Sequence, residues 1–193
     1  MLAPLLTYIR ERSITPLTDA DLSLLQEAFI PAKLRKRQFF LKEGEVCEYF
    51  AFIVKGAMRQ YRIDADGQLQ ILNLCIENWW MSDRESFHKA TPTIYNIDAW
   101  EETDVLLLPK ANNYYARVNA IPAFNEMRIR LDDNHHIASQ RRLLAAMNQT
   151  AAYRYQALLK SYPGFIDRFP QHMIASYLGI TKETLSRVRR GKR

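Results

Sequence analysis

The stretch QHMIASYLGITKETLSRVRR, from Gln171 to Arg190, contains the residue types that two helices need to meet at a sharp angle. Apolar residues recur where such helices pack, and the small Ala175 stands where their backbones approach. Gly179 tolerates the positive φ of a tight turn. Thr181 can cap the second helix, with Glu183 in the first turn at the positive end of the helix dipole. The pattern therefore predicts a helix-turn-helix.

The second helix of such a pair enters the major groove of DNA and contacts base edges. Lys182, Glu183 and Arg187 are the candidates for this contact. An arginine can bind guanine through two hydrogen bonds, and a glutamate can accept one from the cytosine amino group. Thr184 completes the candidates on this helix. Phosphate contacts, which position a protein without reading sequence, are expected from Thr181, Ser186, Arg189, Arg190, Lys192 and Arg193.

The charge distribution supports a polyanion contact at one end of the chain. The formal net charge is +6 over 193 residues, and 181–193 holds six basic residues against one acidic residue. Most of the excess is thus local, which is typical of a protein that binds nucleic acid with one part of its surface. A solvated basic tail on an ordinary helical hairpin is the alternative. It would explain the charge but not the spacing of Ala175 and Gly179.

The two cysteines, Cys47 and Cys75, exclude a disulfide framework and are fewer than the roughly four ligands of an iron–sulfur cluster. Both are expected to be buried small hydrophobes, with a redox-sensing thiol as the alternative. The start of the sequence lacks the pattern of a signal peptide, and no apolar run reaches the ~18 residues of a membrane span. These observations predict a soluble, cytoplasmic protein.

Between Lys36 and Pro109 the chain alternates in the manner of short β-strands, several separated by glycine. Asp66-Gly67 is typical of a hairpin turn. Such a series of short strands predicts a barrel, roll or sandwich. Before it, the period from Thr18 to Ile30 is helical, and Thr18 with Asp21 three residues later indicates where that helix begins.

After Pro109 the period becomes helical again. A long helix is expected from Pro122 to Met147, and a second from about Gln149 to Ser161. One stripe of the long helix contains Phe124, Met127, Leu131, Ala138 and Ala145. Its length favours a seam between two subunits, and packing within one subunit is the alternative.

With these residues in hand, the chain resembles the Crp–Fnr family of transcription regulators, the family of the catabolite activator protein. The segment EYFAFIVKGAMRQYRIDADGQ is similar to the family's cyclic-nucleotide-binding β-roll, and TKETLSRVRR to its recognition helix. The resemblance implies an α+β fold in three parts. These are a sensor of helices and β-roll over 1–118, a dimerisation helix over 119–147 and a DNA-binding helix-turn-helix over 148–193.

The resemblance also implies a homodimer that binds promoter DNA through Lys182, Glu183 and Arg187 and works with RNA polymerase. Two departures modify this expectation. Relatives that bind cyclic AMP have a Gly-Glu pair and, further along, an arginine that pairs with the phosphate. Here Ser82-Asp83 and Thr93 stand at those positions. A buried phosphate without a cationic partner is costly, so a cyclic nucleotide is not expected and no other cofactor is predicted.

The second departure concerns a small β-wing that follows the recognition helix in many relatives. The sequence ends at Arg193, and the tail Arg189–Arg193 is expected to supply phosphate contacts in place of a wing.

A ligand pocket inside the roll is a further possibility. Its candidate residues are Trp79, Trp80, Ser82, Asp83 and Thr93. The alternative, which the sequence favours, is that the tryptophans pack the roll against the long helix. The four histidines lack the spacing of strand-borne metal ligands, so neither a metal nor a cupin-type enzyme is expected. The remaining functional alternative is a small-molecule-binding module that docks a protein partner.

Overall fold

The computed structural model describes residues 2–191. Contacts within the chain divide it into two compact units. The first unit comprises the residues up to Arg62 together with Asn73–Asp132, and the second comprises Ile63–Leu72 and the residues from Asp133 onward. No helix of this described part of the chain is both long and apolar enough to cross a membrane.

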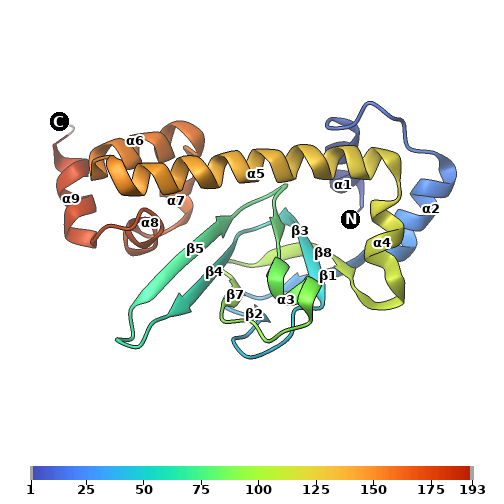
Figure 1. Ribbon diagram of the computed structural model, residues 1–193, viewed down its shortest axis with the longest axis horizontal. Coiled ribbons are helices and arrows are strands. Elements are labelled where there is room, and N and C mark those ends of the chain that lie inside the picture. The colour runs from blue at the N-terminus through green and yellow to red at the C-terminus, as the bar shows by residue number, and fades with distance from the viewer. Residues whose placement is uncertain (1, 192–193) are drawn as a thin grey trace. The chain divides into compact units, whose positions relative to one another are not determined.

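The first unit contains the N-terminal helices and the strands, except for the distal end of the β4–β5 hairpin, Ile63–Leu72 (Figure 1). Its helices are α1 (Ala3–Arg10), α2 (Asp19–Ala28), α3 (Arg84–Lys89), α4 (Tyr114–Asn119) and the start of α5 (Pro122–Asn148), with a short 3-10 turn at Ala111–Asn113. The strands are β1 (Ile30–Leu34), β2 (Phe39–Leu41), β3 (Tyr49–Lys55), β4 (Met58–Ile63), β5 (Leu69–Cys75), β6 (Trp80–Met81), β7 (Asn96–Ala99) and β8 (Thr103–Pro109). The α+β class is confirmed.

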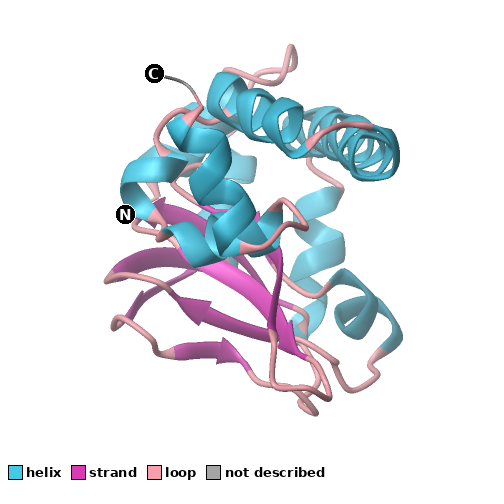
Figure 2. Cartoon of the chain, turned by 90° about the vertical axis from the view of Figure 1, so that its left-hand side faces the viewer, coloured by secondary structure: helices cyan, strands magenta, loops and turns pink. Residues whose placement is uncertain are grey.

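The strands form two four-stranded sheets, ordered β1-β8-β3-β6 and β2-β7-β4-β5 (Figure 2, magenta). Antiparallel pairing aligns Phe52 of β3 with Leu106 of β8 and Gln60 of β4 with Ile97 of β7. At the β3–β4 turn, Gly56 has φ +103°, and a Cβ there would lie 2.7 Å from the backbone of Thr103. Only glycine fits this close approach of two strands.

Alternation along the strands produces a hydrophobic core on each side of the first sheet. Ala51, Ile53 and Val105 point between the two sheets, where they meet residues of β2, β4 and β7. Their neighbours Phe52 and Leu106 point to the opposite face, which the helices cover. Both faces of the central strands β3 and β8 are therefore buried, as their apolar sequences require.

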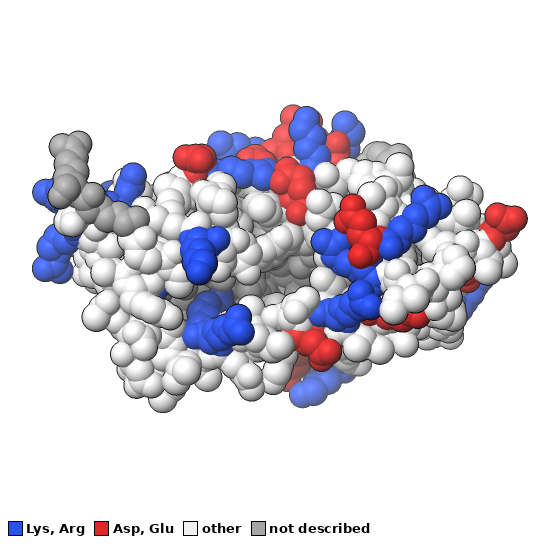
Figure 3. All heavy atoms as spheres, turned by 90° about the horizontal axis from the view of Figure 1, so that it is seen from above, with Lys and Arg blue, Asp and Glu red and all other residues white. Residues whose placement is uncertain are grey.

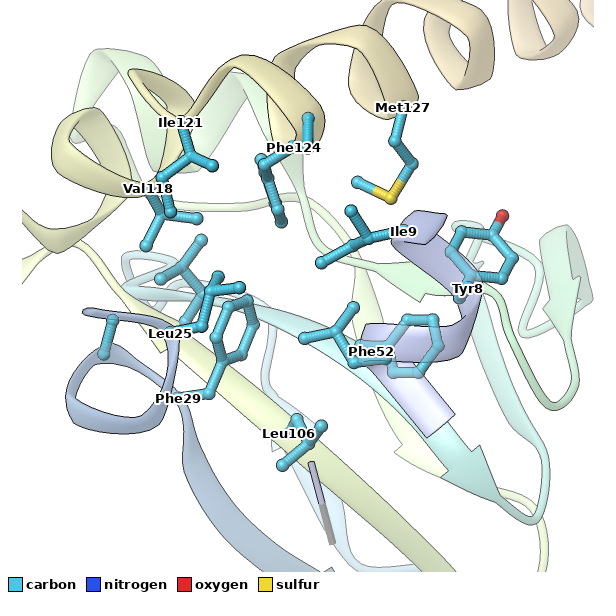
Figure 4. Close-up of a cluster of buried hydrophobic side chains, with 14 residues drawn as sticks. Tyr8, Ile9, Leu25, Phe29, Phe52, Leu106, Val118, Ile121, Phe124 and Met127 are labelled. Carbon is cyan, nitrogen blue, oxygen red and sulfur yellow. The ribbon is translucent and has the colours of Figure 1, made fainter. Parts of the chain in front are cut away.

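The first turns of α5 pack against the face of the first sheet that the helices cover (Figure 4). Phe124 and Met127 are buried against Ile9 of α1, Phe29 and Phe52. The apolar stripe predicts a subunit seam through both residues, and for them this prediction is wrong, because they are buried within their own subunit. Helical periodicity reveals an apolar stripe but not the surface that it packs against.

Three elements of this unit differ from the sequence expectation. The N-terminal apolar patch forms α1, Ile30–Leu34 forms a strand instead of ending a helix, and a helix, α3, interrupts the series of strands. The α2 start is confirmed, because Thr18 and Asp21 form a reciprocal capping box. The long helix, expected over Pro122–Met147, extends over Pro122–Asn148.

The second unit contains the rest of α5, α6 (Ala151–Ser161), α7 (Phe165–Arg168), α8 (Gln171–Tyr177), α9 (Lys182–Arg190) and the distal end of the β4–β5 hairpin. Figure 1 shows α6–α9 gathered beside the C-terminal half of α5. Thr150 caps α6 by accepting a hydrogen bond from the Tyr153 amide at 3.2 Å. The buried residues at the centre of this group are Tyr155, Leu158, Phe165, Phe169, Met173, Ile174 and Leu185.

Candidate nucleic-acid interface

The helices α8 and α9 form the helix-turn-helix that the sequence predicted. Helix α8 ends at Tyr177, and Gly179 has φ +64°. In the turn, the Ile180 amide donates to the Ala175 carbonyl at 3.0 Å. The positive φ of Gly179 redirects the chain, and α9 begins three residues later at Lys182. Ala175 is buried where the two helices meet, as its small side chain allows.

The first turn of α9 is fixed by its cap. The Thr181 hydroxyl accepts a hydrogen bond from the Thr184 amide at 3.1 Å, as expected of an N-cap residue. Hydrogen bonds from its own backbone amide and from the Thr181 side chain lower the pKa of Glu183. This exposed carboxylate is therefore ionised at neutral pH and can accept a hydrogen bond from a base.

Helix α9 has a buried apolar side and an exposed polar side. Leu185 is 1% exposed and anchors the helix to the core of the unit, whereas Lys182, Glu183 and Arg187 are exposed. Arg187 donates to the Thr184 hydroxyl at 3.3 Å, and this bond orients its guanidinium on the helix surface. The three candidate base-reading residues are thus accessible on a helix that buries its apolar side.

Among the residues expected to contact phosphate, Arg189 lies on the Leu185 side of α9, where both line a small pocket with Tyr155 and Ile174. Arg189 and Arg190 are exposed in the last turn of α9, and Arg190 donates to the Ser186 hydroxyl at 3.1 Å. Lys192 and Arg193 lie outside the described residues. Lys and Arg side chains lie at the left-hand edge of the view in Figure 3. This arrangement of cations suits a polyanion.

The turn between α8 and α9 is also held by Arg154, a residue that the sequence does not single out. Arg154 of α6 donates through Nη1 to the Leu178 carbonyl at 2.8 Å. This carbonyl follows the last residue of α8 and has no partner within the helix. A Cβ at Gly179 would lie 3.6 Å from the same guanidinium nitrogen. No local pattern in α6 predicts this role, since the contact joins residues far apart in the sequence.

In the first unit, the positions that hold phosphate in cyclic-AMP-binding relatives contain a different set of contacts. Asp83 is 6% exposed and Thr93 is 3% exposed. The Thr93 hydroxyl donates to Asp83 Oδ2, while Asp83 Oδ1 accepts from the amides of Glu85 and Ser86. Asp83 therefore caps α3. Thr93, which stands where cyclic-AMP-binding relatives have the arginine, is buried and its hydroxyl already donates to Asp83, so these residues lack the cation that a buried phosphate needs.

The other pocket candidates lie in different surroundings. Ser82 donates to the Tyr49 carbonyl at 3.2 Å. Trp80 contacts the rings of Phe52 and Phe124, and Trp79 packs against the core between the sheets. The packing of Trp80 against α5 agrees with the alternative that the sequence favoured. Ligand binding by any of these residues stays a prediction.

A cavity of about 210 Å³ lies in the β2–β3 region and is lined by Phe40, Leu41, Glu45, Val46, Cys47, Glu48 and Tyr49. None of the five pocket candidates lines it. Both cysteines are buried, and burial raises the pKa of Cys75 to about 12. Since the thiolate is the reactive form, Cys75 is unsuited to sensing oxidants.

Comparisons with known proteins agree with this geometry. Residues 31–114 match the family model described as "Cyclic nucleotide-binding domain". No curated protein is matched. FixK2 from Bradyrhizobium japonicum is similar in structure, with a TM-score of 0.67 and 21% identity over 84% of this chain and 83% of that chain.

Two further solved structures share the fold. The catabolite activator protein of Thermus thermophilus has a TM-score of 0.54 and 20% identity, over 91% of this chain and 83% of its own. A protein from Eubacterium rectale, assigned to the Crp/Fnr family of transcriptional regulators, has a TM-score of 0.65 and 17% identity over the same shares of the two chains. Residues 31–114 are therefore similar to the cyclic-nucleotide-binding domain, and the chain shares the fold of these three solved structures.

Proposed function

We propose that this protein is a DNA-binding transcription regulator of the Crp–Fnr type and not an enzyme. The observation that carries the proposal is the exposed face of α9, where Lys182, Glu183 and Arg187 follow a capped N-terminus. A recognition helix needs an ordered first turn, accessible hydrogen-bonding side chains and a buried opposite side. Helix α9 combines all three.

The proposed regulator is a homodimer, and its seam is the apolar surface of the second half of α5. Ile137, Leu144 and Met147 are 44%, 59% and 72% exposed. Their spacings of seven and three residues follow the repeat by which two helices wind around each other. Exposed apolar side chains in such a row favour contact with a second copy.

A symmetric dimer fixes the distance between the two recognition helices. Two recognition helices related by two-fold symmetry would enter successive major grooves about 34 Å apart, so the operator is expected to be a two-fold symmetric sequence. The homodimer would act in the cytoplasm, with promoter DNA and RNA polymerase as its partners.

The β-roll of this regulator would not respond to cyclic AMP. Thr93 stands where cyclic-AMP-binding relatives have the arginine that pairs with the phosphate, and its hydroxyl donates to the buried carboxylate of Asp83, whose other partners are two backbone amides. A second negative charge at this place would be repelled, with no arginine to offset the cost of its burial. The effector, if the protein has one, is of a different chemical class.

The test is selection of bound duplexes from a random pool, followed by gel-shift titration with and without cyclic AMP. We expect enrichment of a symmetric site, affinity that falls steeply with salt, and no effect of the nucleotide. Failure to retain any duplex at low salt would contradict the proposed function and favour a module that docks a protein partner. Tighter binding with cyclic AMP would contradict the account of the roll.

A further inference from the structure

The distal end of the β4–β5 hairpin, Ile63–Leu72, belongs to the same compact unit as the C-terminal helices. The contact centres on Ser176 of α8. Its hydroxyl accepts a hydrogen bond from the Ile71 amide at 2.8 Å and donates one to the Leu69 carbonyl at 2.8 Å. One side chain thus uses both its donor and an acceptor position on the backbone of a single strand.

The two backbone groups are those that an edge strand leaves open. The order β2-β7-β4-β5 places β5 at the edge of its sheet. In an antiparallel sheet, every second residue directs both its N–H and its C=O to the same side of the strand. Leu69 and Ile71 are two residues apart, so their free groups face the same way. Ser176 pairs with them as a residue of a further strand would.

This use of a helical serine is specific to the contact. A serine inside a helix commonly points to solvent or bonds to the carbonyl four residues before it. Ser176 instead reaches the hairpin, and Ile71 is only 7% exposed. The contact therefore shields the Ile71 amide from water.

A second side chain joins the same place from α5. Arg142 donates through Nη1 to the Leu72 carbonyl at 2.9 Å, and its guanidinium lies 4.8 Å from the centre of the Tyr177 ring. Tyr177 directly follows Ser176 on α8. The hairpin, α5 and α8 are thus connected through neighbouring residues, and these residues constitute the clamp. Displacement of any one element would break at least one of these contacts.

The clamp leaves the proposed reading surface free. Its residues belong to α5, α8 and the hairpin, whereas Lys182, Glu183 and Arg187 of α9 are exposed. The clamp is therefore compatible with bound DNA. It restricts the motion of α8, and α9 is joined to α8 through the buried contacts of the turn.

We propose that Ser176 is a positioning residue, which fixes the helix-turn-helix to the hairpin and so preorganises α9 for DNA. This inference rests on the proposed function. Strands β4 and β5 continue from the hairpin into the first unit, so a change there that displaces these strands is transmitted to α8. The clamp itself lies within the second unit, where it joins the hairpin, α5 and α8.

The test compares Ser176→Ala with Ser139→Ala, a half-buried serine of α5 that takes no part in the clamp. Amide hydrogen exchange is followed at Ile71, and affinity is measured on the selected operator and on an unrelated duplex. Loss of two hydrogen bonds should speed exchange of the Ile71 amide about 5- to 30-fold in Ser176→Ala alone. Affinity for both duplexes should fall roughly threefold or more, because a smaller fraction of the protein is preorganised.

Arg142→Gln provides a second exchange measurement, should Ser176→Ala lose stability as a whole. It removes the bond to Leu72 and should also speed exchange at Ile71. Unchanged exchange in both variants would overturn the clamp. Faster exchange with unchanged DNA affinity would overturn its positioning role while leaving the proposed function intact. A wild-type chain that binds no DNA would instead refute the proposed function itself.

Discussion

Single hydroxyl groups determine the local geometry at two places in this chain. Thr181 fixes the first turn of α9, where the candidate base-reading residues begin. Thr93 completes the hydrogen bonds of the buried Asp83, in the place of the arginine that binds phosphate in relatives. One threonine therefore orders the first turn of the helix that we propose meets DNA, while the other completes the hydrogen bonds of a buried carboxylate.

Arg187 tests whether α9 reads bases. Arg187→Ala should weaken binding to the selected operator by ~1–3 kcal/mol and relax base choice at one position in each half-site. The reason is the loss of two hydrogen bonds to one base edge. Gel-shift titration of operators substituted at each position measures the effect, with Arg189→Ala as the control. An equal loss on every sequence would show that Arg187 contacts phosphate only.

Substitution of Thr93 tests the hydrogen bonds of the buried Asp83 carboxylate. Thr93→Val removes the hydroxyl that donates to Asp83 and accepts from the Tyr95 amide. A buried carboxylate that loses a donor should cost about 1–3 kcal/mol in the free energy of unfolding. Denaturant titration measures this, and the exposed Thr91→Val should change stability by less than about 0.5 kcal/mol. Equal stability of the two variants would mean that water replaces the hydroxyl without cost.

At the scale of helices and strands, the helix-turn-helix was predictable because each of its requirements is local. A small residue such as Ala175, a residue that tolerates positive φ such as Gly179, and an N-cap residue such as Thr181 are each required by the local backbone geometry. Helix α3 was not predictable in the same way. It has only six residues, too few for an apolar pattern of helical period to be recognised in the sequence. It is stabilised by the cap from Asp83 and by a hydrogen bond from Lys110 to the Phe87 carbonyl.

The other features that the sequence did not predict depend on contacts between residues that are far apart along the chain. Phe124 and Met127 were recognised as one apolar stripe, but only the packed structure identifies their neighbours as α1 and the first sheet. Arg154 and Ser176 lack a sequence signal because their partners, Leu178 and the β5 edge, become neighbours through folding. The base-reading candidates were found because their position follows directly from the cap.

Substitution of Gly179 tests whether the positive φ in the turn between α8 and α9 requires glycine. Gly179→Ala would place a Cβ in ordinary contact, 3.6 Å from Arg154, so its cost arises from the backbone. With φ at +64°, a residue that has a Cβ should destabilise the fold by about 1–2 kcal/mol. Thermal unfolding of Gly164→Ala is the matched control, since Gly164 has φ −72° and nothing within 4 Å of the added carbon. Equal effects at both positions would contradict strain at the turn.

At the scale of the whole molecule, the proposed function requires two copies, and Leu144 tests the seam. Leu144→Asp would bring an unpaired carboxylate into each half of a symmetric helix pair, and should weaken the dimer about tenfold or more. Sedimentation equilibrium measures the association, with the exposed Gln149→Asp as a control of equal charge. If Leu144→Asp stays as dimeric as the control, the seam lies elsewhere on the chain.

The cations at the end of the chain test how the molecule as a whole holds DNA. Each neutralised phosphate releases condensed counterions, so log affinity falls with log salt by roughly 0.9 per phosphate. Removing Arg189–Arg193 should therefore weaken binding to all duplexes alike and make that slope shallower by about 0.9 for each phosphate that these cations neutralise. A control replaces four exposed cations of the first unit by glutamine, namely Arg35, Lys36, Lys42 and Lys55. This control lowers the net charge equally but should keep the slope, because counterion release depends on which cations meet phosphates and not on total charge. Equal slopes for the truncated chain and the wild type would show that α9 binds without its basic end.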